Sequence, residues 1–454
     1  MAGVSIYVAG SGRSGDAYLM LLSGVLLGYA VLGRGFAYLG LPPLYIGEIT
    51  LLTGIVIFWR TRCFAGVLTT FPALLLAATM GWVLLRTLPF IDSYGIDALR
   101  DSVVVMYGGF AFIVTALLLE DGRRVNKIVQ YYGAFVNIYI PTTPFIFVAG
   151  RYIGDSLPEI PGTGVPFLQL QPTDLAVHLA GAAVFALVGF REVTRLWLVF
   201  LLAGLAVTGA VARGPMLAEV LPITAAMLLL GKWRQLTLIS MAGLVVFWVA
   251  YVVEPVFYDY AEASSSIERP ISTRQVVDNV MSIAGQGGEQ TEGTKEWRLQ
   301  WWTMIIENTV FGPNFWTGRG FGLNIALADG FGRLHFNPPL RSPHNVEMTM
   351  LARAGLPGVV LWLAIVVSWL GLMIQAMRTA RRRGETEWAG LFLFLGCYAG
   401  SIIINASFDP VLEGPMQGIW FWSLIGFGIG SVMVYRRRHM ASPNLVADTL
   451  TLIE

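Results

Sequence analysis

A histidine stands at position 344, and the types of its neighbours would let it move a proton. Ser342 and Pro343 are typical of a helix start, because serine caps free backbone N–H groups and proline fits the first helical position. The sequence therefore predicts a helix that begins here, with His344 in its first turn. The positive end of the helix dipole disfavours a protonated imidazole there, and a neutral histidine is suited to act as a general base.

Other residues of the same stretch are expected to support this histidine. Asn345 follows it directly, and Glu347 is expected on the same helix face, where its carboxylate could orient the ring. Gly355 and Pro357 are expected to bend or interrupt the helix just before the next apolar run. The alternative interpretation is a helix that enters a membrane and carries one interfacial histidine.

Composition places the chain in a membrane. Of its 454 residues, 55% are hydrophobic and only 13% are charged, and the mean hydropathy is +0.64. Soluble proteins carry about 25% charged residues. Runs long enough to cross a bilayer, about twenty residues each, predict an all-α polytopic membrane protein of about twelve transmembrane helices. The runs lie near 17–38, 44–60, 64–86, 102–119, 128–149, 174–190, 196–212, 214–231, 235–253, 355–377, 387–408 and 417–435.

The positions of basic residues predict the orientation, because loops that stay in the cytoplasm are enriched in lysine and arginine. Seventeen basic residues fall on the side of the N-terminus, against five in the short loops of the other side. The five are Arg34, Arg86, Arg100, Arg151 and Arg213. Both termini are therefore expected in the cytoplasm. The first run lacks a convincing cleavage site, which indicates a retained anchor rather than a removed signal peptide.

This topology predicts three parts of the chain. Residues 1–253 are expected to hold the first nine spans, 254–343 one large external subdomain, and 344–454 the last three spans with a short cytoplasmic tail. Within the subdomain, Lys295–Ile306 has apolar residues at helical spacing and predicts an amphipathic helix at the membrane surface. The loop Gly318–Gly322 that follows could bring its backbone close to a ligand, or could be a simple turn.

Charged residues beside membrane spans are costly and therefore indicate a role. Arg213 separates two apolar runs with almost no loop, so it must face water, a partner or an anion; snorkelling or a pair with Glu219 are the alternatives. Arg100 could form a local ion pair with Asp101. The cations expected on the external side are Arg86, Arg100, Arg213, Arg298, Arg319, Arg341 and Arg353. A diphosphate would suit such a set, because guanidinium groups bind phosphate oxygens in pairs and keep their charge.

Several classes of site are not supported by the sequence. The four histidines and two cysteines are too scattered for metal-ligand spacing or a disulfide framework, so we predict no metal and no cofactor. They are His178, His335, His344, His439, Cys63 and Cys397. A net charge of +1 gives no reason to expect nucleic acid as a partner.

The order His344-Asn345, nine further residues, then Gly355-x-x-Gly358 resembles the signature of the bacterial O-antigen ligase family. This family also includes O-antigen polymerases and related oligosaccharyl transferases. The resemblance extends to the many spans, to the single large loop between the ninth and tenth, and to Arg298, which is followed by tryptophans and the glycine-rich turn.

The resemblance implies a membrane-embedded glycosyltransferase of the C type in the bacterial inner membrane, with its active site facing the periplasm. Such an enzyme takes a glycan from an undecaprenyl diphosphate carrier and transfers it to lipid A-core oligosaccharide, without a metal, in lipopolysaccharide assembly. On this hypothesis His344 is the general base, Asn345 and Glu347 support it, and the anomeric centre is inverted. The residues assigned to the diphosphate are Arg100, Arg213, Arg298, Arg319 and Arg341.

Alternatives stay open at this point. An O-antigen polymerase would use another carrier-linked glycan as acceptor, and a protein O-oligosaccharyltransferase would use a protein, both with the same donor. A lipid or sugar transporter belongs to a different class, in which repeated halves and ionisable residues at mid-membrane are common. The sequence shows no obvious repeat, and its longest spans hold few such residues.

Overall fold

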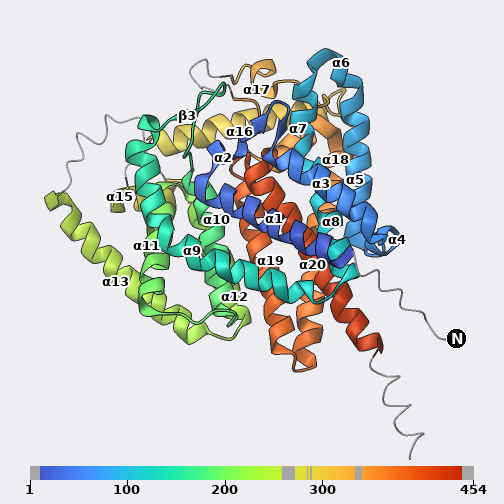
Figure 1. Cartoon of the computed structure of the whole chain (residues 1–454). Coiled ribbons are helices and arrows are strands. Elements are labelled where there is room, and N and C mark those ends of the chain that lie inside the picture. Colours follow the sequence, from blue (N-terminus) through green and yellow to red (C-terminus); the bar gives the residue numbers. More distant parts are fainter. Residues whose placement is uncertain (1–10, 258–270, 284, 287–288, 333–339, 442–454) are drawn as a thin grey trace, which may run out of the picture.

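The structure, a computed structural model, describes residues 11–257, 271–283, 285–286, 289–332 and 340–441, and these form a bundle of helices (Figure 1). The β-structure in the described part of the chain consists of two short antiparallel hairpins. In one, β1 (Gly40–Leu41) pairs with β2 (Leu44–Tyr45), and in the other β3 (Glu159–Ile160) pairs with β4 (Val165–Pro166). The predicted all-α fold class is confirmed.

Every predicted apolar run contains a helix. These helices are α1 (Ser11–Leu32), α3 (Ile46–Thr61), α5 (Phe71–Thr87), α7 (Ile96–Met106) with α8 (Gly109–Glu120), α9 (Arg124–Ile153), α10 (Pro172–Leu187), α11 (Arg195–Val211), α12 (Arg213–Leu229), α13 (Trp233–Phe257), α18 (Val346–Arg382), α19 (Thr386–Ala406) and α20 (Pro415–Ala441). The hydrophobic runs thus fold as helices because a helix satisfies all its backbone polar groups internally, as a lipid environment requires.

Seven helical segments in the described residues are long and apolar enough to cross a membrane, or eight if α7 and α8, bent by 41°, form one span. The other four, α3, α10, α11 and α12, have 16 or 17 residues. At 1.5 Å per residue they reach about 25 Å, somewhat less than a hydrocarbon core of about 30 Å. The protein is therefore a multi-pass membrane protein, and its total of twelve spans stays a prediction.

Shorter elements connect these helices. They are α2 (Arg34–Ala37), α4 (Phe64–Val67), η1 (Leu88–Phe90), α6 (Ile91–Tyr94), η2 (Gly154–Ser156), α15 (Thr273–Ile283), α16 (Glu289–Val310), α17 (Ile325–Ala328) and η3 (Val411–Glu413). The helix predicted at 295–306 lies within α16. Residues 258–270 and 333–339 of the predicted external subdomain, His335 included, lie outside the described residues.

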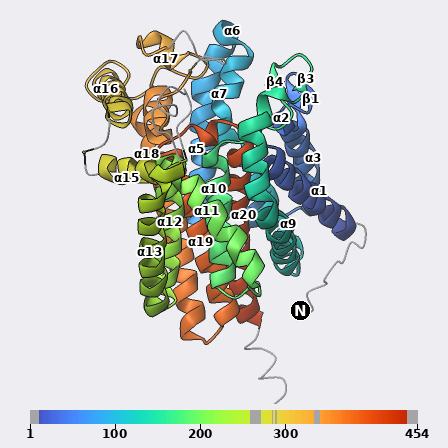
Figure 2. The same cartoon turned by 90° about the vertical axis from the view of Figure 1, so that its left-hand side faces the viewer.

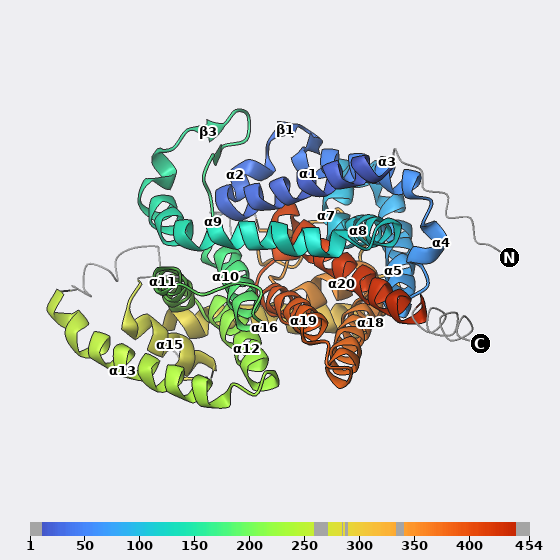
Figure 3. The ribbon, with the colours of Figure 1, turned by 60° about the horizontal axis from the view of Figure 1, so that its bottom comes forward.

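Helices α19 and α20 form the centre of the bundle, with 78% and 89% of their apolar windows buried. Buried indoles tie their neighbours to them: the Nε1–H of Trp369 on α18 donates to the carbonyl of Ile425 on α20, at 3.0 Å. In contrast, none of the apolar window of α13 is buried, and this helix runs along the outer edge of the molecule (Figure 3).

Basic residues of the predicted cytoplasmic loops lie at one end of the bundle. At this end, Arg381 donates to the carbonyl of Leu229 (2.6 Å) and Arg437 to that of Leu119 (3.2 Å). Basic side chains suit these places because the last carbonyls of a helix lack partners within it. Helices α16, α17 and the start of α18 lie at the opposite end (Figure 2). The basic loops and the predicted external segment are thus separated, while the compartment that each end faces stays a prediction.

Helix α18 is interrupted at Gly355, as predicted, where φ is 69° and ψ is −171°. The carbonyls just before this break accept hydrogen bonds from the loop that follows α16. The backbone N–H of Arg319 donates to Ala352 at 2.8 Å, and that of Gly320 donates to Arg353 at 3.0 Å. The break therefore lets the loop bond to helix carbonyls that would otherwise be used inside α18.

The glycine loop Gly318–Gly322 approaches the protein's own backbone. A Cβ on Gly318 would lie 2.4 Å from the carbonyl carbon of Arg353, and φ at Gly318 is +60°. A Cβ on Gly320 would lie 2.0 Å from the ring of Phe90. These glycines allow a close turn against α18 and η1, so the interpretation as a turn is supported, while an approach of this loop to a ligand stays a prediction.

Candidate active site

The backbone between Arg341 and Asn345 is held from several sides. The Nε1–H of Trp302 on α16 donates to the carbonyl of Pro343 at 2.9 Å. Asn345 donates from Nδ2 to the carbonyl of Ser407 at 3.0 Å, and its Oδ1 accepts from the N–H of Met348 at 2.8 Å. Asn345 is therefore the N-cap of α18, whose first residue is Val346.

His344 consequently lies just before the helix, and its predicted place in the first turn is wrong. Ser342 does not cap this helix, because it is buried and hydrogen-bonds Glu413. The φ of His344 is 54°, a left-handed value that is uncommon for a residue with a side chain. Such a conformation persists where the surroundings hold it, and it is frequent at functional sites.

The partner of the His344 ring is Asp409, in the loop between α19 and α20. Nδ1 of His344 lies 3.1 Å from Oδ1 of Asp409, and both side chains are partly exposed. The prediction that Glu347 orients the ring is wrong, because Glu347 accepts a hydrogen bond from Nε1 of Trp362 at 3.5 Å instead. Because α18 starts after His344, the two residues do not share a helix face.

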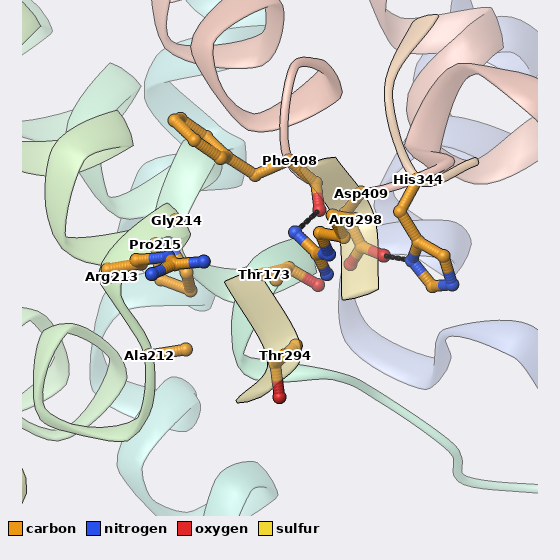
Figure 4. A pocket seen from close by; sticks show the side chains of 10 residues that line it. All are labelled: Thr173, Ala212, Arg213, Gly214, Pro215, Thr294, Arg298, His344, Phe408 and Asp409. Atoms are coloured by element: carbon orange, nitrogen blue, oxygen red, sulfur yellow. Dashed lines mark hydrogen bonds and ion pairs between the residues drawn. The ribbon is translucent and has the colours of Figure 1, made fainter. Parts of the chain in front are cut away.

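A cavity of about 280 Å³ brings three predicted site residues together: Arg213, Arg298 and His344. In the view of Figure 4, Arg213 and His344 lie on opposite sides, with Arg298 and Asp409 between them. The other lining residues are Thr173, Ala212, Gly214, Pro215, Thr294 and Phe408. Segments far apart in the sequence therefore build one polar site at one end of the bundle.

Each arginine of the cavity is placed by its own element. Arg213 is the first residue of α12, and the extended residue Ala212 is the whole connection to α11. Its Nη1 lies 3.4 Å from Oγ of Ser282 on α15. Arg298, on α16, donates from Nη1 to the carbonyl of Phe408 at 2.8 Å. The alternative ion pair between Arg213 and Glu219 is not formed among the described residues. The Glu219 carboxylate instead accepts a hydrogen bond from Thr208.

Two helices direct their N-termini to this cavity, and a third begins beside it. Thr173 is in the first turn of α10, Gly214 and Pro215 are in that of α12, and His344 stands two residues before α18. Free N–H groups and the positive ends of helix dipoles favour an anion at such places. Together with the two guanidinium groups they make the cavity suitable for a multiply charged anion.

Three of the arginines predicted to hold a diphosphate are placed elsewhere. Arg341 lies 3.0 Å from Asp101, and Arg319 lies 3.0 Å from Asp329. Arg100 is 52% exposed. None of these three arginines lines the described cavity, because each is directed to other groups at this end of the bundle. Of the five arginines assigned to the diphosphate, these three therefore lie outside the cavity that Arg213 and Arg298 line.

Asp101 is the centre of a buried charge network and not a partner of Arg100. Its Oδ2 lies 3.0 Å from Arg341 and 2.9 Å from Arg353, whose side chain is 1% exposed. Burial raises the pKa of the nearby Glu413 carboxyl, although Arg353 acts to lower it. The network links α7, α18 and η3, and through Arg341 it anchors the segment that carries His344.

The sequence did not single out Asp409, Thr173, Thr294 or Ser282. Asp409 offered one usable signal: a carboxylate between the last two predicted spans, on the same side as His344. The hydroxyl residues gave none, because serine and threonine are common at helix starts for capping alone.

The fold and the cavity define a polytopic helical membrane protein with a cationic site at one end of its bundle. Residues 175–363 match the family model described as O-antigen ligase, which supports the O-antigen ligase family for this part of the chain. The matched range holds Arg213, Arg298 and His344. The resemblance stated from the sequence is thus confirmed, and with it a link to lipopolysaccharide biosynthesis and to glycosyltransferase-like ligases and polymerases. A search of curated proteins finds no match to the chain.

Proposed function

We propose that the protein is an O-antigen ligase that transfers a glycan from undecaprenyl diphosphate to lipid A-core oligosaccharide. The observation that supports this best is the cavity that Arg213, Arg298 and His344 line together. It offers cations for an anionic leaving group and a histidine for the acceptor within one small volume, as direct glycosyl transfer from a diphosphate requires.

Arg213 and Arg298 are proposed to bind the diphosphate. Their guanidinium groups and the N-terminus of α12 would stabilise the negative charge that grows on the leaving group as its bond to the sugar breaks. Because arginines supply this positive charge, we propose that the reaction needs neither a metal ion nor another cofactor. The active site would be that of a C-type glycosyltransferase.

His344 is proposed as the general base, oriented by Asp409. A carboxylate accepts hydrogen bonds, so Nδ1 of His344 carries the proton toward Asp409 and the lone pair lies on Nε2. Nε2 would take the proton of the acceptor hydroxyl as its oxygen bonds to the anomeric carbon. The bond from that carbon to the diphosphate breaks on the opposite face, so the anomeric configuration is inverted.

The proposed location is the bacterial inner membrane, with the cavity facing the periplasm. The separation of the basic loops from the cavity end supports this orientation, because basic loops stay on the cytoplasmic side. The donor and the acceptor are both lipid-anchored, so each would reach the site from within the membrane.

The test is a transfer assay with purified protein in lipid nanodiscs and a carrier-linked glycan as donor. Lipid A-core, a second carrier-linked glycan and a pilin-like protein are offered as acceptors in parallel. Extension of lipid A-core supports the ligase. Extension of the carrier-linked glycan or of the protein assigns the polymerase or the protein-glycosylating activity instead, and no transfer to any acceptor contradicts the proposal.

A further inference from the structure

Helix α15 (Thr273–Ile283) buries polar side chains and exposes apolar ones, which is the reverse of a helix on a water-exposed surface. Its buried residues are polar: Gln275, Asn279 and Ser282 are 9%, 0% and 1% exposed. Three of its apolar residues are exposed, with values of 37% for Val277, 50% for Val280 and 38% for Met281, and the charged Arg274 in its first turn is exposed beside them. A helix in water buries its apolar face, so this arrangement indicates that α15 has a polar partner inside and an apolar surrounding outside.

The polar partner is the hairpin formed by α11 and α12. Nδ2 of Asn279 donates to the carbonyl of Ala210 in the last turn of α11, at 2.9 Å, and Gln275 donates to Oδ1 of Asn279 at 3.1 Å. Ala210 lies three residues before Arg213. Asn279 thereby satisfies a carbonyl that the end of α11 leaves free, and it fixes α15 directly above the tip of the hairpin.

Ser282 extends this contact to the guanidinium group. Its Oγ donates to the carbonyl of Asn279 at 2.9 Å, so its lone pairs face Nη1 of Arg213 at 3.4 Å. Below the tip, the hairpin is closed by the hydrogen bond from Thr208 on α11 to the buried carboxylate of Glu219 on α12. Arg213 is therefore supported from α15 on one side and by the closed hairpin on the other.

Helix α15 is attached to the end of α13, the span with no buried apolar window. Glu254, near the end of α13, accepts hydrogen bonds from the backbone N–H of Thr273 at 2.8 Å and from its hydroxyl. This carboxylate caps the start of α15, where the helix dipole favours negative charge. Glu254 thus joins the end of the exposed helix α13 to the start of α15.

We propose that α15 is an interfacial membrane helix: its Val277 and Val280 face lies in lipid, while Asn279 and Ser282 position Arg213 for the diphosphate. Asn279 and Ser282 are positioning residues, since they act through Arg213. The positioning role rests on the proposed function, whereas the placement in lipid does not. This separation makes the failure of one distinguishable from the failure of the other.

Lipid contact is tested with nitroxide labels on single cysteines, in protein whose Cys63 and Cys397 are replaced by alanine. Labels at 277 and 280 in nanodiscs should be more accessible to oxygen than to a water-soluble nickel chelate, as at Val246 on α13, which is 69% exposed. The exposed Glu159 in β3 is the reference for water. If both labels behave like the one at 159, the interfacial placement is overturned.

Positioning is tested by binding of undecaprenyl diphosphate without a sugar, so that catalysis is not needed. Since one hydrogen bond contributes about 1 kcal/mol, Ser282→Ala should raise Kd by up to about fivefold, and Asn279→Leu, which loses two hydrogen bonds, by about tenfold or more. Ser282→Thr keeps the hydroxyl and should restore binding. Val280→Ala, next to Asn279 on the outward face, is the matched control and should leave Kd unchanged.

The binding and labelling experiments test the positioning role and the placement in lipid separately. Equal Kd values for Asn279→Leu, Val280→Ala and the unaltered protein would overturn the positioning role. Failure of the unaltered protein to bind undecaprenyl diphosphate would overturn the proposed function and the positioning role with it. The label accessibilities would still decide the placement of α15 in lipid.

Discussion

Nδ1 of His344 lies 3.1 Å from Oδ1 of Asp409, and this contact joins the segment that precedes α18 to the loop between α19 and α20. The same loop contributes the Phe408 carbonyl that accepts from Arg298. One short loop therefore positions both the proposed base and a proposed phosphate ligand. This arrangement explains how residues on separate helices can keep a fixed relation across the cavity.

The Asp409 carboxylate is expected to affect turnover rather than donor binding. Asp409→Ala should lower kcat about 10- to 100-fold with little change in the donor KM, because the ring loses its orientation and its preferred tautomer. Asp409→Asn keeps an accepting oxygen and should lose less. Steady-state kinetics with varied donor measures both constants. Glu347→Gln is the control and should stay near normal; a larger loss there than at Asp409 would restore Glu347 as the orienting residue.

His344 itself allows a test that separates chemistry from folding. His344→Ala and His344→Gly should both lose about 10²- to 10⁴-fold in kcat, since a general base is removed. Their stabilities should differ, because φ is 54° and alanine in the left-handed region costs about 1 kcal/mol that glycine does not. Thermal unfolding in detergent should therefore give the glycine variant the higher Tm. Near-normal turnover of either variant would remove His344 from the mechanism.

The cavity arginines and the arginines outside it should respond differently. Arg213→Ala and Arg298→Ala should weaken donor binding by about 10-fold or more each, since a charge-assisted hydrogen bond contributes roughly 1.5–3 kcal/mol. Arg213→Lys and Arg298→Lys should retain part of the binding, because lysine keeps the positive charge but lacks the paired donors of a guanidinium group. Arg100→Ala is the exposed control and should bind the donor normally. A donor Kd that rises equally in all three alanine variants would show that the cavity is not the diphosphate site.

Local sequence patterns predicted much of this architecture because they follow from local physics. Hydrophobic runs predicted the helices, and the position of Arg213 between two such runs predicted its place at the tip of a hairpin. The break at Gly355 followed from residue type. Each of these depends on residues that are neighbours in the chain.

Contacts between distant segments could not be predicted in the same way. Arg341, Arg319 and Arg213 are equal as outward cations in the sequence, and only the packed structure shows that the first two meet carboxylates. The helix start was misplaced for a related reason: Ser342 and Asn345 are both good caps, and the contact of Ser342 with Glu413 decides between them.

The break in α18 gives a prediction about stability with a control in the same helix. Gly355→Ala should lower the free energy of unfolding by about 2 kcal/mol or more, because φ is 69° and the added Cβ would lie 2.7 Å from the carbonyl oxygen of Phe315. Gly371, also on α18, has open space where a Cβ would be added. Gly371→Ala should therefore be neutral or stabilising by about 0.5–1 kcal/mol.

Unfolding titrations of both variants in mixed micelles measure the difference. Gly355→Ala should also lower transfer activity, because the loop 315–320 bonds to the carbonyls beside the break and packs against the part of α18 that follows His344. Gly371→Ala should retain full activity. If the two variants unfold at the same denaturant concentration, the interruption at Gly355 does not hold this end of the bundle, and the placement of His344 must depend on the hydrogen bonds of residues 341–345 alone.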